Sequence, residues 1–233
     1  MMRGGGGGVK RQLLASCAMA GIVLLGGDRP RGASAQAAPA FAPARWESGP
    51  LPAGPPPNVA GWIEEMLDVA VDAAGAVQTA TPIRRSPLPR DLVAPAVSRW
   101  RFRPAAVRGQ PVPAHVLVAA LFRPPVLYNA PAIGQPAVDL APAPLEIPFP
   151  VNAPPPLYPP LGAGDGVVLV EAAVGADGAV HTARVAAGAP GFTQPALEAA
   201  RAWRFRAARR DGQPVESFAY LVFGFRRPLA AGQ

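Results

Sequence analysis

The sequence predicts an α+β fold of two small β-β-α-β modules, each an antiparallel sheet covered by one helix. Three features lead to this prediction: an internal repeat, stretches of alternating apolar residues that end in glycine-containing turns, and one short apolar-faced helix in each repeat. Alternation with period two is typical of a strand with one buried face, and a period near 3.6 is typical of a helix.

The repeat shows as four matching landmarks, each recurring 103 residues later in the chain. The pairs are Gly75–Val77 with Gly178–Val180, Trp100–Arg103 with Trp203–Arg206, Gly109–Val112 with Gly212–Val215, and Phe122 with Phe225. Because the spacing is constant, no insertion or deletion falls between the landmarks, and a duplication explains the pattern.

The second copy gives the order of elements most clearly. The predicted elements are a strand over Val168–Val174, a hairpin turn at Gly175–Gly178, a strand over Val180–Val185, a helix ending at Trp203, and a last strand over Ser217–Phe225. Thr193 is the predicted N-cap of the helix, and Pro195 lies in its first turn, where a missing N–H costs little.

The first copy is predicted to be degenerate, and either less stable or dependent on its neighbour. Glu64 and Glu65 stand where the second copy has Val167 and Val168. As neighbours in a strand, the two glutamates point to opposite faces and do not form an acid pair. Pro95 falls inside the expected helix and is predicted to shorten or kink it.

Residues 1–37 are predicted to be an export signal peptide. Arg3, Lys10 and Arg11 precede an apolar stretch at 13–27, and two A-x-A patterns follow within residues 33–37. An uncleaved anchor in the inner membrane and a lipoprotein modified at Cys17 remain alternatives. All three place the rest of the chain in the periplasm.

Composition divides the remainder into two modules and two linkers. The chain contains 32 Pro and 25 Gly, which concentrate in Pro- and Ala-rich stretches predicted to be linkers at 38–57 and 124–156. The modules are then residues 58–123 and 157–227. Proline-rich sequence of this kind favours an extended, semi-rigid conformation.

The net charge of +7 does not predict a nucleic-acid partner. The arginines are scattered, Lys10 is the only lysine, and no basic run is interleaved with aromatic residues. One alternative reading uses this charge: a structural scaffold of the envelope whose arginines contact peptidoglycan.

The sequence predicts no catalytic site, cofactor or metal site. His115 and His181 are the only histidines, and they occupy different positions in the two copies. The only cysteine, Cys17, lies in the predicted signal, and no spacing of ligand residues is typical of a metal centre. A deep pocket beside His115 or His181 would reopen the question of an enzyme.

The second module resembles the C-terminal domain of TonB-type energy transducers. The ordered residues that carry this resemblance are Tyr158, Pro159, Gly178, Trp203, Phe205, Gly212, Pro214 and Phe225. The first copy has the counterparts of the later part of this set and lacks the Tyr-Pro opening.

The resemblance implies a protein linked to transmembrane transport that binds an extended segment of an outer-membrane TonB-dependent receptor, or of another envelope protein. In that family the segment adds to an exposed strand edge. Ser217–Phe225 is the candidate edge, with Phe218, Tyr220 and Val222 on one face. The alternative is that these residues fill the core or pair with the other copy.

Two departures from the family bear on function. The apolar stretch at 13–27 contains no histidine, so coupling to a proton-driven motor is not predicted. The tandem arrangement instead favours bivalent binding or a scaffold role. Whether the chain forms a homodimer is left open.

Overall fold

The computed structural model describes residues 41–54, 59, 61–87, 91–125 and 136–228. The predicted signal at 1–37 lies outside these residues, and residues 38–233 form a compact unit of their own. None of the helices in the described ranges is long and apolar enough to cross a membrane.

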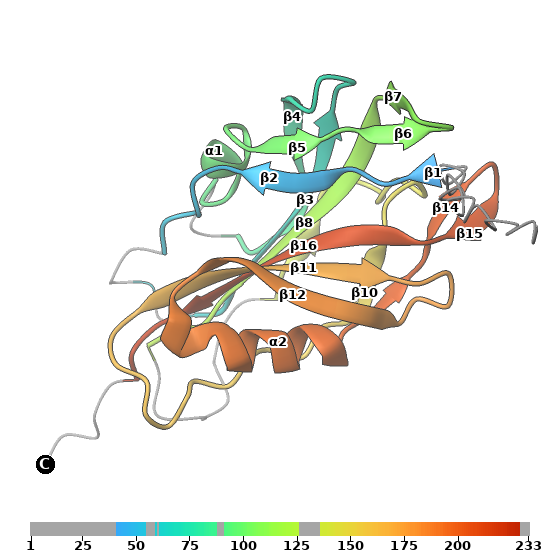
Figure 1. The fold of residues 1–233 in the computed structure, drawn as a ribbon. Coiled ribbons are helices and arrows are strands. Elements are labelled where there is room, and N and C mark those ends of the chain that lie inside the picture. Colours follow the sequence, from blue (N-terminus) through green and yellow to red (C-terminus); the bar gives the residue numbers. More distant parts are fainter. Residues whose placement is uncertain (1–40, 55–58, 60, 88–90, 126–135, 229–233) are drawn as a thin grey trace, which may run out of the picture. The chain divides into compact units, whose positions relative to one another are not determined.

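Seven strands form one sheet, in which the two halves of the chain meet (Figure 1). In spatial order they are β12 (Val180–Gly188), β11 (Gly166–Val174), β16 (Ser217–Phe225), β8 (Ala114–Phe122), β3 (Ile63–Val71), β4 (Val77–Arg85) and β9 (Val138–Asp139). Every neighbouring pair is antiparallel except β16 with β8, which are parallel from Ala219↔Leu117 to Gly224↔Phe122.

The spacing found in the sequence extends to whole elements. The strands β3, β4 and β8 begin 103 residues before β11, β12 and β16, respectively. The short strands β5 (Arg101–Arg103), β6 (Ala105–Val107) and β7 (Gln110–Val112) precede β13 (Arg204–Arg206), β14 (Ala208–Arg210) and β15 (Gln213–Val215) by the same interval. The α+β class is confirmed, but the halves share one sheet and do not form a sheet each.

One glycine in each half is required by close packing of the backbone. Gly75 and Gly178 have φ of +81° and +78°, and a Cβ on either would overlap the carbonyl oxygen of Phe102 or Phe205. The same residues bond through the main chain, with Phe102 N donating to Gly75 O at 2.8 Å and Phe205 N to Gly178 O at 2.9 Å. The landmark glycines therefore fix where β5 and β13 meet the hairpins.

The helices α1 (Ala94–Val97) and α2 (Thr193–Ala202) cover opposite faces of the sheet (Figure 1). Two similar units that join through parallel strands are related by a half-turn about the strand direction. The helix of one unit therefore covers one face of the sheet, and the helix of the other unit covers the opposite face. Each core consequently takes residues from both halves. Met66, Leu117 and Leu121 pack in the cluster under α2, whereas Tyr220 and Val222 pack in the cluster under α1.

Both predicted linkers contain paired strands, contrary to the prediction of extended, unpaired segments. In 38–57, β1 (Phe41–Ala42) pairs with β6, and β2 (Arg45–Ser48) pairs with β5. In 124–156, β10 (Phe149–Asn152) pairs with β13, and β9 pairs with β4.

A tryptophan in each half ties a proline of these segments to its core. Trp100 Nε1 donates to Pro50 O at 2.8 Å, and Trp203 Nε1 donates to Pro154 O at 3.0 Å. Pro50 and Pro154 themselves lie outside the paired strands β2 and β10, so they remove no donor from these ladders.

The helix starts differ from the predictions in detail. α1 has only four residues, and Pro95 lies in its first turn, where its missing N–H interrupts no helical hydrogen bond. Thr193 does not cap α2, because its Oγ1 donates to Pro190 O at 2.9 Å within η1 (Pro190–Phe192).

Replacing Leu117 by alanine tests whether the halves share a core. Leu117 lies in β8 of the first half but is fully buried in the cluster under α2. We expect Leu117→Ala to lower the free energy of unfolding by about 2–5 kcal/mol, as for other buried leucines, measured by denaturant titration with tryptophan fluorescence. Leu161→Ala is the control, because Leu161 is 99% exposed. Equal effects of the two substitutions would contradict a shared core.

Candidate functional site

The predicted binding edge, Ser217–Phe225, is not an edge. It forms β16, which pairs with β11 along its whole length on one side and with β8 on the other. The prediction of an exposed edge is wrong, and pairing with the other copy is what the structure shows. The physical reason is that β8 and β16 are both buried along nearly their whole length, which is typical of strands in the interior of a sheet.

The three side chains named for this edge share one face, but none is free to receive a peptide. Tyr220 and Val222 are fully buried in the cluster under α1. Phe218 is half-buried, and the Arg45 guanidinium lies 5.0 Å from its ring centroid.

The residues that carry the family resemblance act mainly in the framework. Tyr158 donates its hydroxyl to Gly164 O at 2.8 Å, and its ring lies 5.6 Å from that of Phe192. Trp203, Phe205 and Phe225 are buried in the cluster under α2. Gly212 has φ of +77° in the turn between β14 and β15, and Pro214 is exposed beside it. Pro159 is half-buried next to Tyr158.

The open edge of the sheet belongs to β12. It is the last strand in the spatial order, and within the described ranges no strand pairs with its outer side. His181, Thr182, Arg184 and Gly188 are exposed along it. An unpaired edge presents main-chain N–H and C=O groups to which another extended segment can bond.

The matching edge in the first half, that of β4, is closed by β9. Asp139 and Val138 pair with Arg84 and Arg85. Beyond the strand, Leu140 N donates to Ile83 O at 2.8 Å, and an ion pair joins Arg84 Nε to Asp139 Oδ1 at 3.4 Å.

Comparison of the two edges shows which groups β12 turns outward. In the β3–β4 pair, Pro82 lies opposite Leu67. Proline has no N–H, so β3 receives no hydrogen bond from the backbone nitrogen at this position. Val185 takes the same place in β12, facing Val170. We infer that Val185 N–H points to the open side, together with the carbonyl of Ala186, the counterpart of Ile83.

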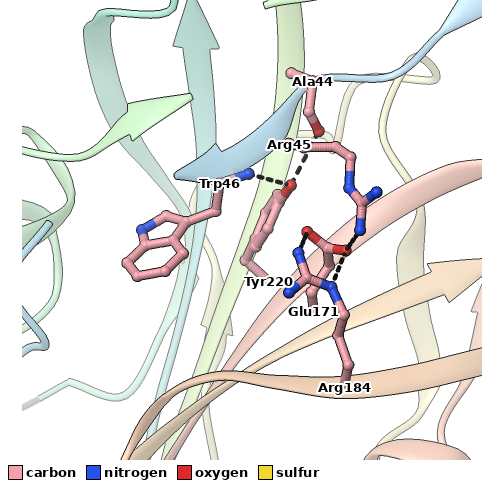
Figure 2. A network of polar contacts seen from close by, with 6 residues as sticks. All are labelled: Ala44, Arg45, Trp46, Glu171, Arg184 and Tyr220. Carbon is pink, nitrogen blue, oxygen red and sulfur yellow. Dashed lines mark hydrogen bonds and ion pairs between the residues drawn. The ribbon is translucent and has the colours of Figure 1, made fainter. Parts of the chain in front are cut away.

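A buried carboxylate fixes the position of β12 (Figure 2). Glu171 of β11 is only 2% exposed. Arg184 of β12 donates from Nε to Oε1 at 2.7 Å and from Nη2 to Oε2 at 2.9 Å, and Arg45 of β2 donates from Nη2 to Oε1 at 2.6 Å. Two-point binding between guanidinium and carboxylate is directional, so it orients Arg184 and stiffens the edge strand.

The same network connects the segment around β2, residues 44–48, to β16. The Tyr220 hydroxyl donates to Ala44 O at 2.9 Å and accepts from Trp46 N at 2.9 Å (Figure 2). Burial raises the pKa of Tyr220 well above its ordinary value, with the nearby Glu171 carboxylate adding to the effect. The phenol is therefore neutral and keeps its proton for the bond to Ala44.

A cavity of about 300 Å³ lies beside His115, the feature that would reopen the question of an enzyme. His115 Nδ1 lies 2.8 Å from Asp68 Oδ1. Ser217 also lines the cavity, but its buried Oγ has no hydrogen-bond partner. A serine nucleophile must be hydrogen-bonded to its base, so this arrangement is not a catalytic pair.

The other candidate groups for chemistry lie apart. His181 Nε2 lies 3.3 Å from Asp177 Oδ2 in an exposed turn. Glu64 pairs with Arg84 at 3.2 Å, whereas Glu65 accepts from Val93 N at 3.1 Å at the start of α1. Burial raises the pKa of Glu65. In the part of the chain that the structure describes, no group of three or more His, Cys, Asp or Glu side chains could hold a metal ion.

Removing both arginines around Glu171 tests the network. The double variant Arg45→Ala/Arg184→Ala leaves a buried carboxylate without a cation, and we expect it to lose about 3 kcal/mol or more of unfolding free energy in urea titrations. Adding Glu171→Gln should restore much of the loss, because the buried group is then neutral.

The control is Arg99→Ala/Arg201→Ala, since both of these side chains are exposed and neither forms an ion pair with a described residue. If the two double variants lose the same stability, or if Glu171→Gln restores nothing, the network does not hold the edge.

Comparison with known families gives a match within the second half of the chain. Comparison with curated proteins found no match. Residues 156–226, under a third of the chain, match the family model described as Gram-negative bacterial TonB protein C-terminal. The match supports a TonB-like protein of the periplasm or inner membrane that is linked to transport, and this domain family is not enzymatic. The segment that holds β11, β12, α2 and β16 is thus similar to the C-terminal domain of TonB proteins, which interacts with outer-membrane receptors.

Proposed function

We propose that this protein is a periplasmic binding module that recognises an extended segment of an outer-membrane receptor by strand addition at the outer edge of β12. The observation that carries the proposal is the unpaired side of β12, within the segment that matches the TonB C-terminal family. In strand addition, main-chain hydrogen bonds supply the affinity and alternate side chains supply specificity.

The first half of the chain supports this choice of edge. There, the strand that corresponds to β12 already receives an extended segment, because β9 pairs antiparallel with β4. The backbone geometry of this edge is therefore compatible with an added strand. β12 has no proline and so keeps the donor that β4 lacks at Pro82.

The central strand β16 is a poor alternative, because a receptor segment would first have to displace β8. Residues 116–122 of β8 are all buried. Exposing a large apolar side chain costs about 1.5–3 kcal/mol, so exposing this strand would use much of the roughly 5–15 kcal/mol that stabilises a typical domain.

The first half then has a defined role in the proposal. We infer that it arose by duplication of the second and that it now covers the side of β16 that a single module would leave open. The predicted signal at 1–37 would deliver the protein to the periplasm, where receptor segments are accessible. Energy transduction does not form part of the proposal.

Proline at position 185 tests the edge directly. Val185→Pro removes the outward N–H and adds a ring on the open side, whereas the fold tolerates proline at the matching Pro82. With peptides from the periplasmic segments of the organism's outer-membrane receptors, we expect chemical-shift changes in residues 180–188. The affinity should fall by roughly two- to tenfold in the variant, as the loss of one hydrogen bond implies.

Val185→Ala is the matched control, since it keeps the N–H and should bind like the unmodified protein. Equal binding by the proline variant, or shift changes confined to another surface, would overturn strand addition at β12.

A further inference from the structure

The segment that closes β4 is held by few contacts. β9 has only two residues, and among the described residues Asp139 forms one ion pair, with Arg84 Nε. Val138 and Leu140 are each 48% exposed, and the Asp139 side chain is 68% exposed. Little apolar surface is therefore buried by β9, and its main-chain bonds to Ile83, Arg84 and Arg85 provide most of the attachment.

This pairing has the properties of a ligand bound to a strand edge. The bonding groups of β9 are backbone atoms, and it adds antiparallel to the outermost long strand. The edge that it covers corresponds, 103 residues earlier, to the edge of β12. A tethered segment competes at an effective concentration on the order of millimolar, which keeps a weak contact closed against a free competitor.

We propose that the outer edge of β4 is a second strand-addition edge, closed in cis by β9, so that each chain binds one extended partner segment and not two. This inference rests on the proposed function for its partner, an extended peptide. The two halves are thus unequal: β12 is open to a partner, and β4 is available only when β9 leaves. The tandem arrangement is monovalent while β9 is in place.

The variant Asp139→Arg/Leu140→Pro is designed to release β9. It places like charges together at Arg84 and removes the donor that bonds to Ile83 O. The expected loss of stability is small, because the replaced side chains are largely exposed. The opposite variant, Arg84→Cys/Asp139→Cys, locks β9 by a disulfide between residues that face each other in the ladder.

The probe is a synthetic peptide of residues 136–142, Pro-Ala-Val-Asp-Leu-Ala-Pro, added at millimolar concentration to residues 38–233. Backbone chemical shifts are followed by NMR. The unmodified protein and the oxidised locked variant should respond only in residues 180–188. The released variant should respond there and also at residues 83–85, with about twice the bound peptide at saturation.

The results separate the two proposals. If the released variant responds at β12 but not at residues 83–85, the second edge does not exist and the inference fails. If β12 stays silent in every variant, the proposed binding edge fails, and a response at residues 83–85 in the released variant alone would still support the inference. A response at residues 83–85 in the locked variant would show that β9 does not close the edge.

Discussion

The structure depends on the parallel pairing of β8 with β16. It joins two similar units into one sheet, and its parallel direction turns one unit over, so that α1 and α2 cover opposite faces. Because β8 and β16 pair with each other, the last long strand of each unit lies in the middle of the shared sheet. The outer strands β4 and β12 are then the places where an extended segment can add.

Small differences make these two outer strands unequal. The added strand β9 closes the first, which has proline at position 82. Valine at position 185 keeps a main-chain N–H on the second strand, and Glu171 anchors its Arg184. The buried Glu171 also links this open strand to the N-terminal segment through Arg45. Of these two outer strands, β4 is therefore covered by β9, and β12 is open within the described residues.

Much of the local structure could be predicted from the sequence, because its signals are local. Alternation and turn glycines located β11, β12 and β16, and a constant spacing of 103 residues located their counterparts. The place of β16 in the sheet was missed, although the nearly continuous apolar run at 116–122 is typical of a strand buried on both faces. β9 and β10 lie in proline-rich sequence, and only their tertiary partners make them strands. The pairing of Glu171 with Arg45 spans 126 residues and leaves no local signal.

Native-state hydrogen exchange tests the central claim most directly. If β8 and β16 form the centre of one cooperative sheet, the amides of residues 117–122 and 219–224 exchange only by global unfolding, with one shared free energy. Amides on the outer side of β12, Val185 among them, should exchange far faster. Exchange of the β16 amides through a separate, lower-energy opening from β8 would contradict the account, because the halves would then separate and β16 would become a transient binding edge.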